Sequence, residues 1–143
     1  MFLSKSGLLV SLSVSCLLAC SGQEPPQCDI QTVHYEPIEV DLRGVPRIMD
    51  FTVELPDGSI GTVSVPVFIL HCPIMVLADE GQLNSDTVAE VQMVQLWGDE
   101  EDIEIVSGLI GTELTITGSL SEWQTAHHFT KVLLHVHAVS AEQ

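Results

Sequence analysis

Residues 111–138, GTELTITGSLSEWQTAHHFTKVLLHVHA, contain two stretches in which apolar and polar residues alternate, with a loop between them. Side chains alternate between the two faces of a strand, so every second residue of each stretch lies on the same face. The apolar faces consist of Leu114 and Ile116 in the first stretch and Val132, Leu134 and Val136 in the second. We therefore expect two strands joined by a loop, around which the rest of the chain is built.

Three more extended segments precede this pair. Residues 37–43 and 49–55 alternate apolar with charged or polar side chains, and Gly44 and Pro46 are expected to break the chain between them. A turn at residues 56–59 follows. The nearly continuous apolar run at residues 62–77 predicts a long strand, either buried on both faces or bent between two regions of the sheet, because it contains two prolines.

A strand at residues 91–97 is followed by an acidic segment with the features of a short helix. Asp99 is the expected N-cap, negative charge occupies the first turn, and Gly111 is the expected end. The buried stripe would consist of Ile103, Val106, Leu109 and Ile110. The expected order is several strands, a short helix and two more strands. This is the order of a small five-stranded OB-like barrel, and we therefore predict this mainly β fold.

The N-terminus has the features of a secretory signal. Lys5 is followed by a short apolar run, which is too short to span a bilayer. The sequence Leu-Leu-Ala-Cys ending at Cys20 resembles a bacterial lipobox, and this resemblance implies cleavage before Cys20 and lipidation of its thiol. We therefore expect a lipoprotein signal peptide at residues 1–19, a lipid-anchored tether at 20–34 and one OB-like domain at 35–143. An ordinary secreted protein cut nearby is the alternative.

The net charge of the chain limits the classes of partner that we expect it to bind. The chain has a net charge of −16, and loss of Lys5 with the signal peptide would make it −17. Nucleic-acid affinity comes largely from Lys and Arg displacing counterions, so we expect no nucleic-acid partner. A basic protein, a peptide or a metal cation fits such a surface better.

Two cysteines remain for the domain once Cys16 is removed and Cys20 is lipidated. An even pair in an exported protein predicts a disulfide between Cys28 and Cys72. Zinc ligation by these thiols together with histidines is the alternative, but no CxxC spacing supports it.

Four of the six histidines lie in residues 127–137. His135 and His137 share a strand face, which suits two ligands of one zinc or copper ion, and His127 or His128 could supply a third. The alternative is that His127 and His128 hydrogen-bond the loop while His135 and His137 face solvent. Apart from such an ion, no cofactor is expected.

The sequence does not indicate an enzyme, because it has no GxSxG, HExxH, CxxC or phosphate-binding glycine loop. Trp123 and Phe129 lie in the last loop, a region in which OB domains bind ligands. Trp123 is therefore a candidate partner anchor, and plugging the end of the barrel is its alternative role.

The segments YEPIEVDLRG, FILHCPIMV, EVQMVQL and GTELTITGSLSEWQTAHHFTKVLLHV resemble an uncharacterised bacterial family, the domain of unknown function 4431. The matching positions in the last segment are His127, His128, Thr130 and Val132. The family has no established activity, so the resemblance supports the fold more than a function.

Two functions fit these features. The first is a non-enzymatic envelope lipoprotein whose barrel binds a protein or peptide, including an inhibitor or immunity role against a basic protein. The second is a metal-binding lipoprotein that uses the C-terminal histidines. Ser21 follows the lipobox cysteine, which by resemblance to Gram-negative sorting implies an outer-membrane anchor facing the periplasm.

Overall fold

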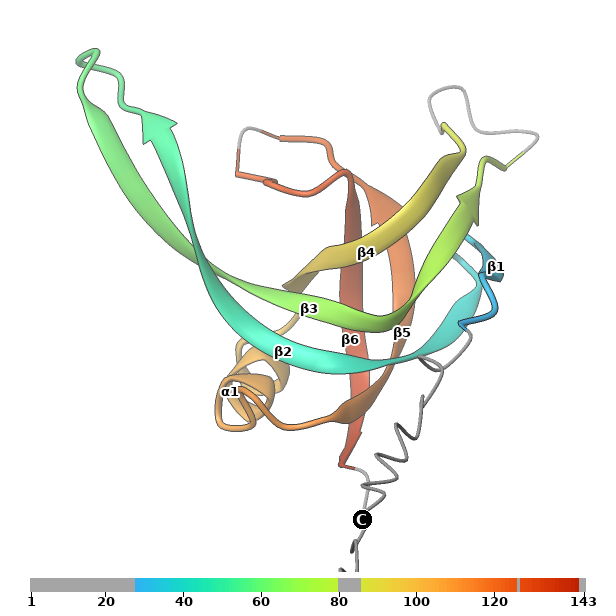
Figure 1. Ribbon diagram of the computed structural model, residues 1–143. Helices are drawn as coiled ribbons and strands as arrows, with labels where there is room; N and C mark the ends of the chain where they lie inside the picture. The colour runs from blue at the N-terminus through green and yellow to red at the C-terminus, as the bar shows by residue number, and fades with distance from the viewer. Residues whose placement is uncertain (1–27, 80–85, 126, 142–143) are drawn as a thin grey trace, which may run out of the picture.

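The computed structural model describes residues 28–79, 86–125 and 127–141, and within them the chain forms six strands and one helix (Figure 1). The elements are β1 (Gln31–His34), β2 (Glu39–Glu54), β3 (Ile60–Leu77), β4 (Val88–Trp97), α1 (Glu100–Ser107), β5 (Leu114–Glu122) and β6 (Val132–Ala141). The predicted signal peptide, the predicted lipidation site Cys20 and the first part of the predicted tether lie outside the described residues. No helix among the described residues is long and apolar enough to cross a membrane.

Five strands close into a barrel. The sheet order is β1-β3-β2-β5-β6-β4, and an additional pairing between β3 and β4 completes the circle. All neighbours in the barrel are antiparallel except β4 and β6, which are parallel. With α1 between the third and fourth barrel strands, this connectivity is that of an OB-type barrel, and the predicted fold class is confirmed.

The predicted interior is also confirmed. Leu114, Ile116, Val132, Leu134 and Val136 are all buried in the core. They pack with side chains from the earlier strands, including Val40, Leu42, Phe68, Ile74, Val76 and Val94.

Gly44 and Pro46 do not break the chain as predicted, because residues 39–54 form one strand that changes partner there. Residues 39–44 of β2 pair with β5, and residues 44–54 pair with β3. A Cβ atom on Gly44 would lie 2.2 Å from the backbone oxygen of Ile69, so only glycine permits this close approach. The two residues mark a bend within one strand and not its end.

Beyond the bend, residues 47–66 form a hairpin that extends away from the barrel, here called the β2–β3 arm (Figure 1). The long strand predicted from the apolar run is present as β3. It pairs with β2 over its first half and with β4 and β1 over its second half. The prediction that it bends from one sheet region to another is therefore correct.

The helix differs from its prediction at both ends. Asp99 is at the N-cap position but its side chain makes no capping hydrogen bond, and α1 ends at Ser107 with Gly108 as its C-cap, instead of at Gly111. Val106 is buried and Ile103 and Leu109 pack against the core, as expected. Ile110 is exposed because it lies beyond the end of the helix, in the turn that leads to β5.

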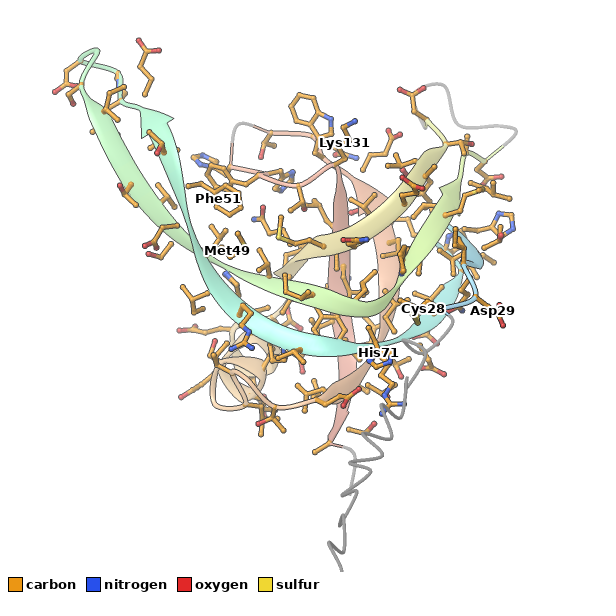
Figure 2. The ribbon with its side chains drawn as sticks, viewed as in Figure 1. Cys28, Asp29, Met49, Phe51, His71 and Lys131 are labelled. Atoms are coloured by element: carbon orange, nitrogen blue, oxygen red, sulfur yellow. A yellow bond between two sulfur atoms is a disulfide. The ribbon has the colours of Figure 1, made fainter. Side chains whose placement is uncertain are left out.

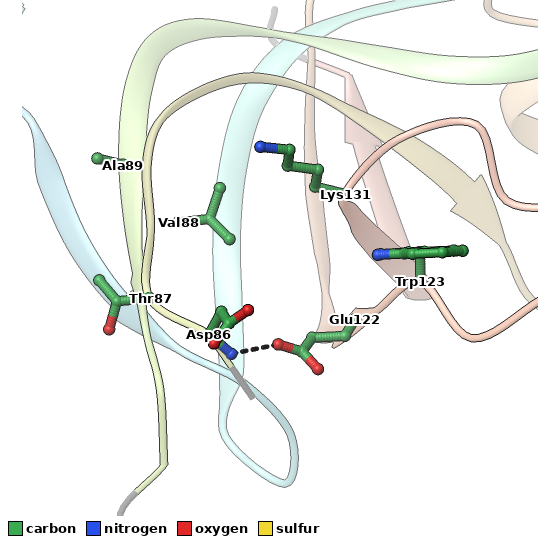
Figure 3. A pocket seen from close by; sticks show the side chains of 7 residues that line it. All are labelled: Asp86, Thr87, Val88, Ala89, Glu122, Trp123 and Lys131. Carbon is green, nitrogen blue, oxygen red and sulfur yellow. Dashed lines mark hydrogen bonds between the residues drawn. The ribbon is translucent and has the colours of Figure 1, made fainter. Parts of the chain in front are cut away.

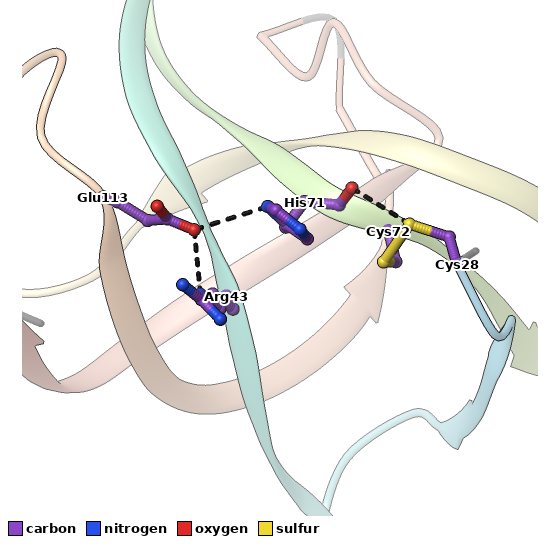
Figure 4. Close-up of polar contacts among 5 residues, drawn as sticks. All are labelled: Cys28, Arg43, His71, Cys72 and Glu113. Carbon is purple, nitrogen blue, oxygen red and sulfur yellow. Dashed lines mark hydrogen bonds and ion pairs between the residues drawn. A yellow bond between two sulfur atoms is a disulfide. The ribbon is translucent and has the colours of Figure 1, made fainter. Parts of the chain in front are cut away.

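Cys28 and Cys72 form the predicted disulfide, with Cα atoms 5.4 Å apart (Figure 4). The bond joins the residues just before β1 to β3, with which β1 pairs in parallel. The sheet therefore takes in residues 31–34, which the sequence places in the tether. Beside the disulfide, the Glu113 carboxylate lies 2.8 Å from Arg43 Nε and 3.3 Å from His71 Nδ1, linking β2 and β3 to the residue just before β5.

Candidate functional site

A groove runs between the first half of β4 and the end of the β5–β6 hairpin. It consists of two adjoining cavities of about 470 and 260 Å³ that share Val88, Ala89 and Lys131. One wall is formed by residues 86–93, and the other by Glu122, Trp123 and residues 129–132. We call this feature the β4 groove; its larger cavity is shown in Figure 3.

The wall formed by β4 has an open strand edge. β4 pairs with β6 only at Gln95, Leu96 and Trp97, and no strand of residues 28–79, 86–125 or 127–141 pairs with that edge N-terminal to Gln95. The Gln95 N–H points away from β3, toward Thr130. Because backbone groups alternate along a strand, those of Val91 and Met93 point to the same side, into the groove.

The β5–β6 loop, described at residues 123–125 and 127–131, is attached to β4 by two polar side chains. The Gln95 amide donates to the His127 carbonyl at 3.2 Å and accepts from the Phe129 N–H at 2.8 Å. The buried Thr130 hydroxyl accepts from the Gln95 N–H at 2.9 Å and donates to the Val132 carbonyl at 2.7 Å. These bonds hold the loop where β4 begins to pair with β6.

The other end of the groove is held at Asp86. The Asp86 N–H donates to the Glu122 carboxylate (Figure 3). The Asp86 carbonyl accepts from the Tyr35 hydroxyl at 3.1 Å. Burial, followed by the nearby charges of Glu122 and Asp86, raises the pKa of Tyr35 to about 12. Tyr35 therefore stays a neutral donor throughout the physiological range.

The two aromatic candidates of the loop have different surroundings. Trp123 lines the groove and is 59% exposed, so it does not plug the barrel. Phe129 stacks on Phe51 of the β2–β3 arm, with ring centroids 4.8 Å apart. Figure 2 shows Phe51 on the side of the arm that faces the loop. Trp123 is thus available to a partner, whereas Phe129 joins the loop to the arm.

The four candidate metal ligands form two separate pairs. His128 Nδ1 accepts the Gln124 N–H at 3.0 Å, and His127 offers its backbone carbonyl to Gln95, so these two residues stabilise the loop. His135 and His137 contact each other on the outer face of β6. Among residues 28–79, 86–125 and 127–141, no group of three or more His, Cys, Asp or Glu side chains is arranged to hold a metal ion.

Four residues of these sites were not identified from the sequence. Tyr35 and Gln95 anchor the groove, and Glu39 and Trp97 contact the His135–His137 pair. Their neighbours depend on strand order and register. One sequence signal was available for Gln95, since it is an amide within the apolar end of a strand, a position where a polar side chain needs partners.

Comparison with known proteins gives little functional information. No curated protein is a significant match to the chain. A solved structure that resembles it is the crystal structure of a small single-stranded DNA-binding protein from Streptomyces coelicolor, with 12% identity, coverage of 73% of this chain and 92% of that chain, and a TM-score of 0.37. The family model described as "Domain of unknown function (DUF4431)" matches residues 93–140, the part that contains β5, β6 and the loop between them, and this match confirms the resemblance to that family.

Proposed function

We propose that this chain is a non-enzymatic, lipid-anchored protein of the bacterial cell envelope whose barrel binds an extended, basic peptide segment of a partner protein in the β4 groove. The observation that carries the proposal is the unpaired edge of β4 beside an exposed tryptophan. An extended peptide can add a strand to such an edge, with its backbone hydrogen-bonding to Val91 and Met93.

The side chains around the edge suit this mode of binding. Trp123 offers a large, half-exposed ring at the groove, and tryptophan is enriched among residues that dominate binding energy. An open edge is also a hazard, because it templates pairing with other chains. Three carboxylates, those of Asp86, Glu90 and Glu122, outnumber the cation Lys131 along the groove, and this balance disfavours acidic strands and favours basic ones.

The chain's charge supports the same class of partner. A net charge of −16 steers basic proteins toward the barrel and opposes nucleic acids. An inhibitor or immunity role against a basic protein is consistent with this charge. The lipobox-like sequence at Cys20 supports a lipid anchor, and Ser21 after it supports the outer membrane, with the barrel facing the periplasm.

The test uses the lipidated chain in detergent and short peptides selected on it from a random display library. We expect basic peptides that slow amide hydrogen exchange at Val91 and Met93. N-methylation of alternate peptide bonds should abolish binding, because it removes the donors of the added strand.

Trp123→Ala should weaken these peptides by about thirtyfold, which corresponds to about 2 kcal/mol for an anchor residue. Trp97→Ala is the matched control, since it removes the other tryptophan, which lies outside the groove, and should leave affinity unchanged. Selected peptides that protect neither amide and bind Trp123→Ala normally would contradict the proposal.

A further inference from the structure

Four strands place a row of side chains on the outer face of the barrel, away from the core. The registers pair Glu39 with Ser119, Ser119 with His135, and His135 with Trp97. His137 lies two residues beyond His135 on the same strand and contacts both His135 and Glu39. Residues far apart in the sequence therefore meet in one cluster.

The carboxylate sets the state of the nearer imidazole. His137 Nδ1 lies 2.7 Å from the Glu39 carboxylate, so this nitrogen carries the proton. In the neutral ring, Nε2 then has a free lone pair, and this nitrogen lies 3.3 Å from His135 Nδ1. That separation is long for an ordinary hydrogen bond.

The same separation suits two ligands of one metal ion. Two nitrogens that bind a tetrahedral zinc ion at 2.0–2.1 Å lie about 3.3 to 3.4 Å apart. Histidine ligands commonly donate their other ring N–H to a carboxylate, which orients the ring and raises its basicity. Glu39 is in that position relative to His137.

We propose that His135 Nδ1 and His137 Nε2 bind a divalent transition-metal ion, with Glu39 orienting His137 as a second-shell carboxylate. Imidazole nitrogen suits copper and zinc, and Cu²⁺ binds more tightly than Zn²⁺ to the same ligands. Because the described residues supply two ligands here, water completes the coordination and the site exchanges its ion. His127 and His128 take no part.

Trp97 gives the site an internal reporter. Its ring stacks on His135, with centroids 4.2 Å apart and an interplanar angle of 18°. A Cu²⁺ ion on His135 would therefore quench Trp97 fluorescence. Since the chain has two tryptophans, Trp123→Phe leaves Trp97 as the sole tryptophan, whose emission is excited selectively at wavelengths that tyrosine does not absorb.

The first experiment titrates the untagged mature chain with Zn²⁺ by calorimetry. We expect one ion per chain, loss of this binding in His135→Ala and in His137→Ala, and affinity lowered at least tenfold in Glu39→Gln. A His127→Ala/His128→Ala variant is the matched control and should bind as the wild type does.

The second experiment titrates Trp123→Phe with Cu²⁺ and follows Trp97 emission. Saturable quenching that disappears in the Trp123→Phe/His137→Ala variant supports the site, because that variant keeps the Trp97–His135 stack. Binding that is lost only with His127 and His128, or quenching that is unchanged without His137, would overturn it. Circular dichroism of each variant establishes that the fold is intact.

Discussion

The two halves of β4 differ in what lies beside them. Residues 95–97 pair with β6, and Gln95 also pairs with β3, whereas residues 88–94 have β3 alone and an open groove. Strand pairing holds residues 95–97, and the hydrogen bonds of Asp86 with Tyr35 and Glu122 hold the chain where residues 88–94 begin. Residues 95–97, the closed half, stabilise the barrel. Residues 88–94, the open half, are where we propose that a partner binds.

Gly118→Ala should lower the free energy of unfolding more than the other variants below, by disrupting the closed half of β4. A Cβ atom on Gly118 would lie 2.1 Å from the backbone oxygen of His135, in the part of β6 that reaches β4. Overpacking of this kind costs about 1 to 3 kcal/mol, and we expect about 3 kcal/mol here because the obstacle is backbone. Urea denaturation with the disulfide intact measures the change.

Gly108→Ala is the matched control, since the nearest atom to its added Cβ is 3.4 Å away and its φ is −70°. It should change the free energy of unfolding by less than about 1 kcal/mol. If both variants lost equal stability, the close approach of β5 and β6 would not be the cause.

Thr130→Val should weaken the boundary between the two halves. Valine has nearly the same shape but leaves the buried Gln95 N–H without its acceptor, at a cost of about 1 to 3 kcal/mol. Hydrogen exchange at the Gln95 amide should accelerate. Thr130→Ser keeps the hydroxyl and should retain slow exchange; fast exchange in both variants would show that the hydroxyl is not the determinant.

The contact between Phe51 and Phe129 should add a smaller coupling between the arm and the loop. A stacked aromatic pair contributes about 0.5 to 1.5 kcal/mol beyond its buried area. A double-mutant cycle with Phe51→Leu and Phe129→Leu should therefore give a coupling of about 1 kcal/mol in the free energy of unfolding. Strictly additive losses would mean that the loop does not depend on the arm.

The sequence predicts the elements well because alternation and turn residues are local signals. The inward faces of β5 and β6, the long bent β3 and the Cys28–Cys72 bond are all present in the structure. The predictions are wrong where residues that usually end a strand have another role in the tertiary structure. Gly44 and Pro46 indicated a break, but they allow one strand to serve two partners.

The candidate sites were less predictable. Trp123 could be found from its position in the loop, and His135 and His137 from their spacing. However, the open edge of β4 and the contact of Glu39 with His137 follow from register between strands distant in sequence. Residue spacing carries no information on such pairings. Spacing also grouped His127 and His128 with the β6 histidines as candidate ligands, whereas in the structure these two residues hydrogen-bond to Gln95 and Gln124.

The hydrogen bond from Tyr35 to Asp86, which anchors the open half of β4, should make the free energy of unfolding depend on pH in alkaline solution and not at neutral pH. The folded pKa of Tyr35 is about 12, above the ordinary value of 10, so the folded state holds this proton more tightly than the unfolded state. The stabilisation is complete below pH 10, declines as the unfolded phenol ionises, and is lost as the pH rises through about 12.

Because the chain has one tyrosine, the ultraviolet absorbance of the phenolate reports the ionisation of Tyr35 alone. Glu122→Gln removes one of the charges that raise the pKa and should shift the titration to lower pH. A folded chain that titrates at the ordinary value would mean that Tyr35 is not held against Asp86, and that the start of the open half lacks this anchor.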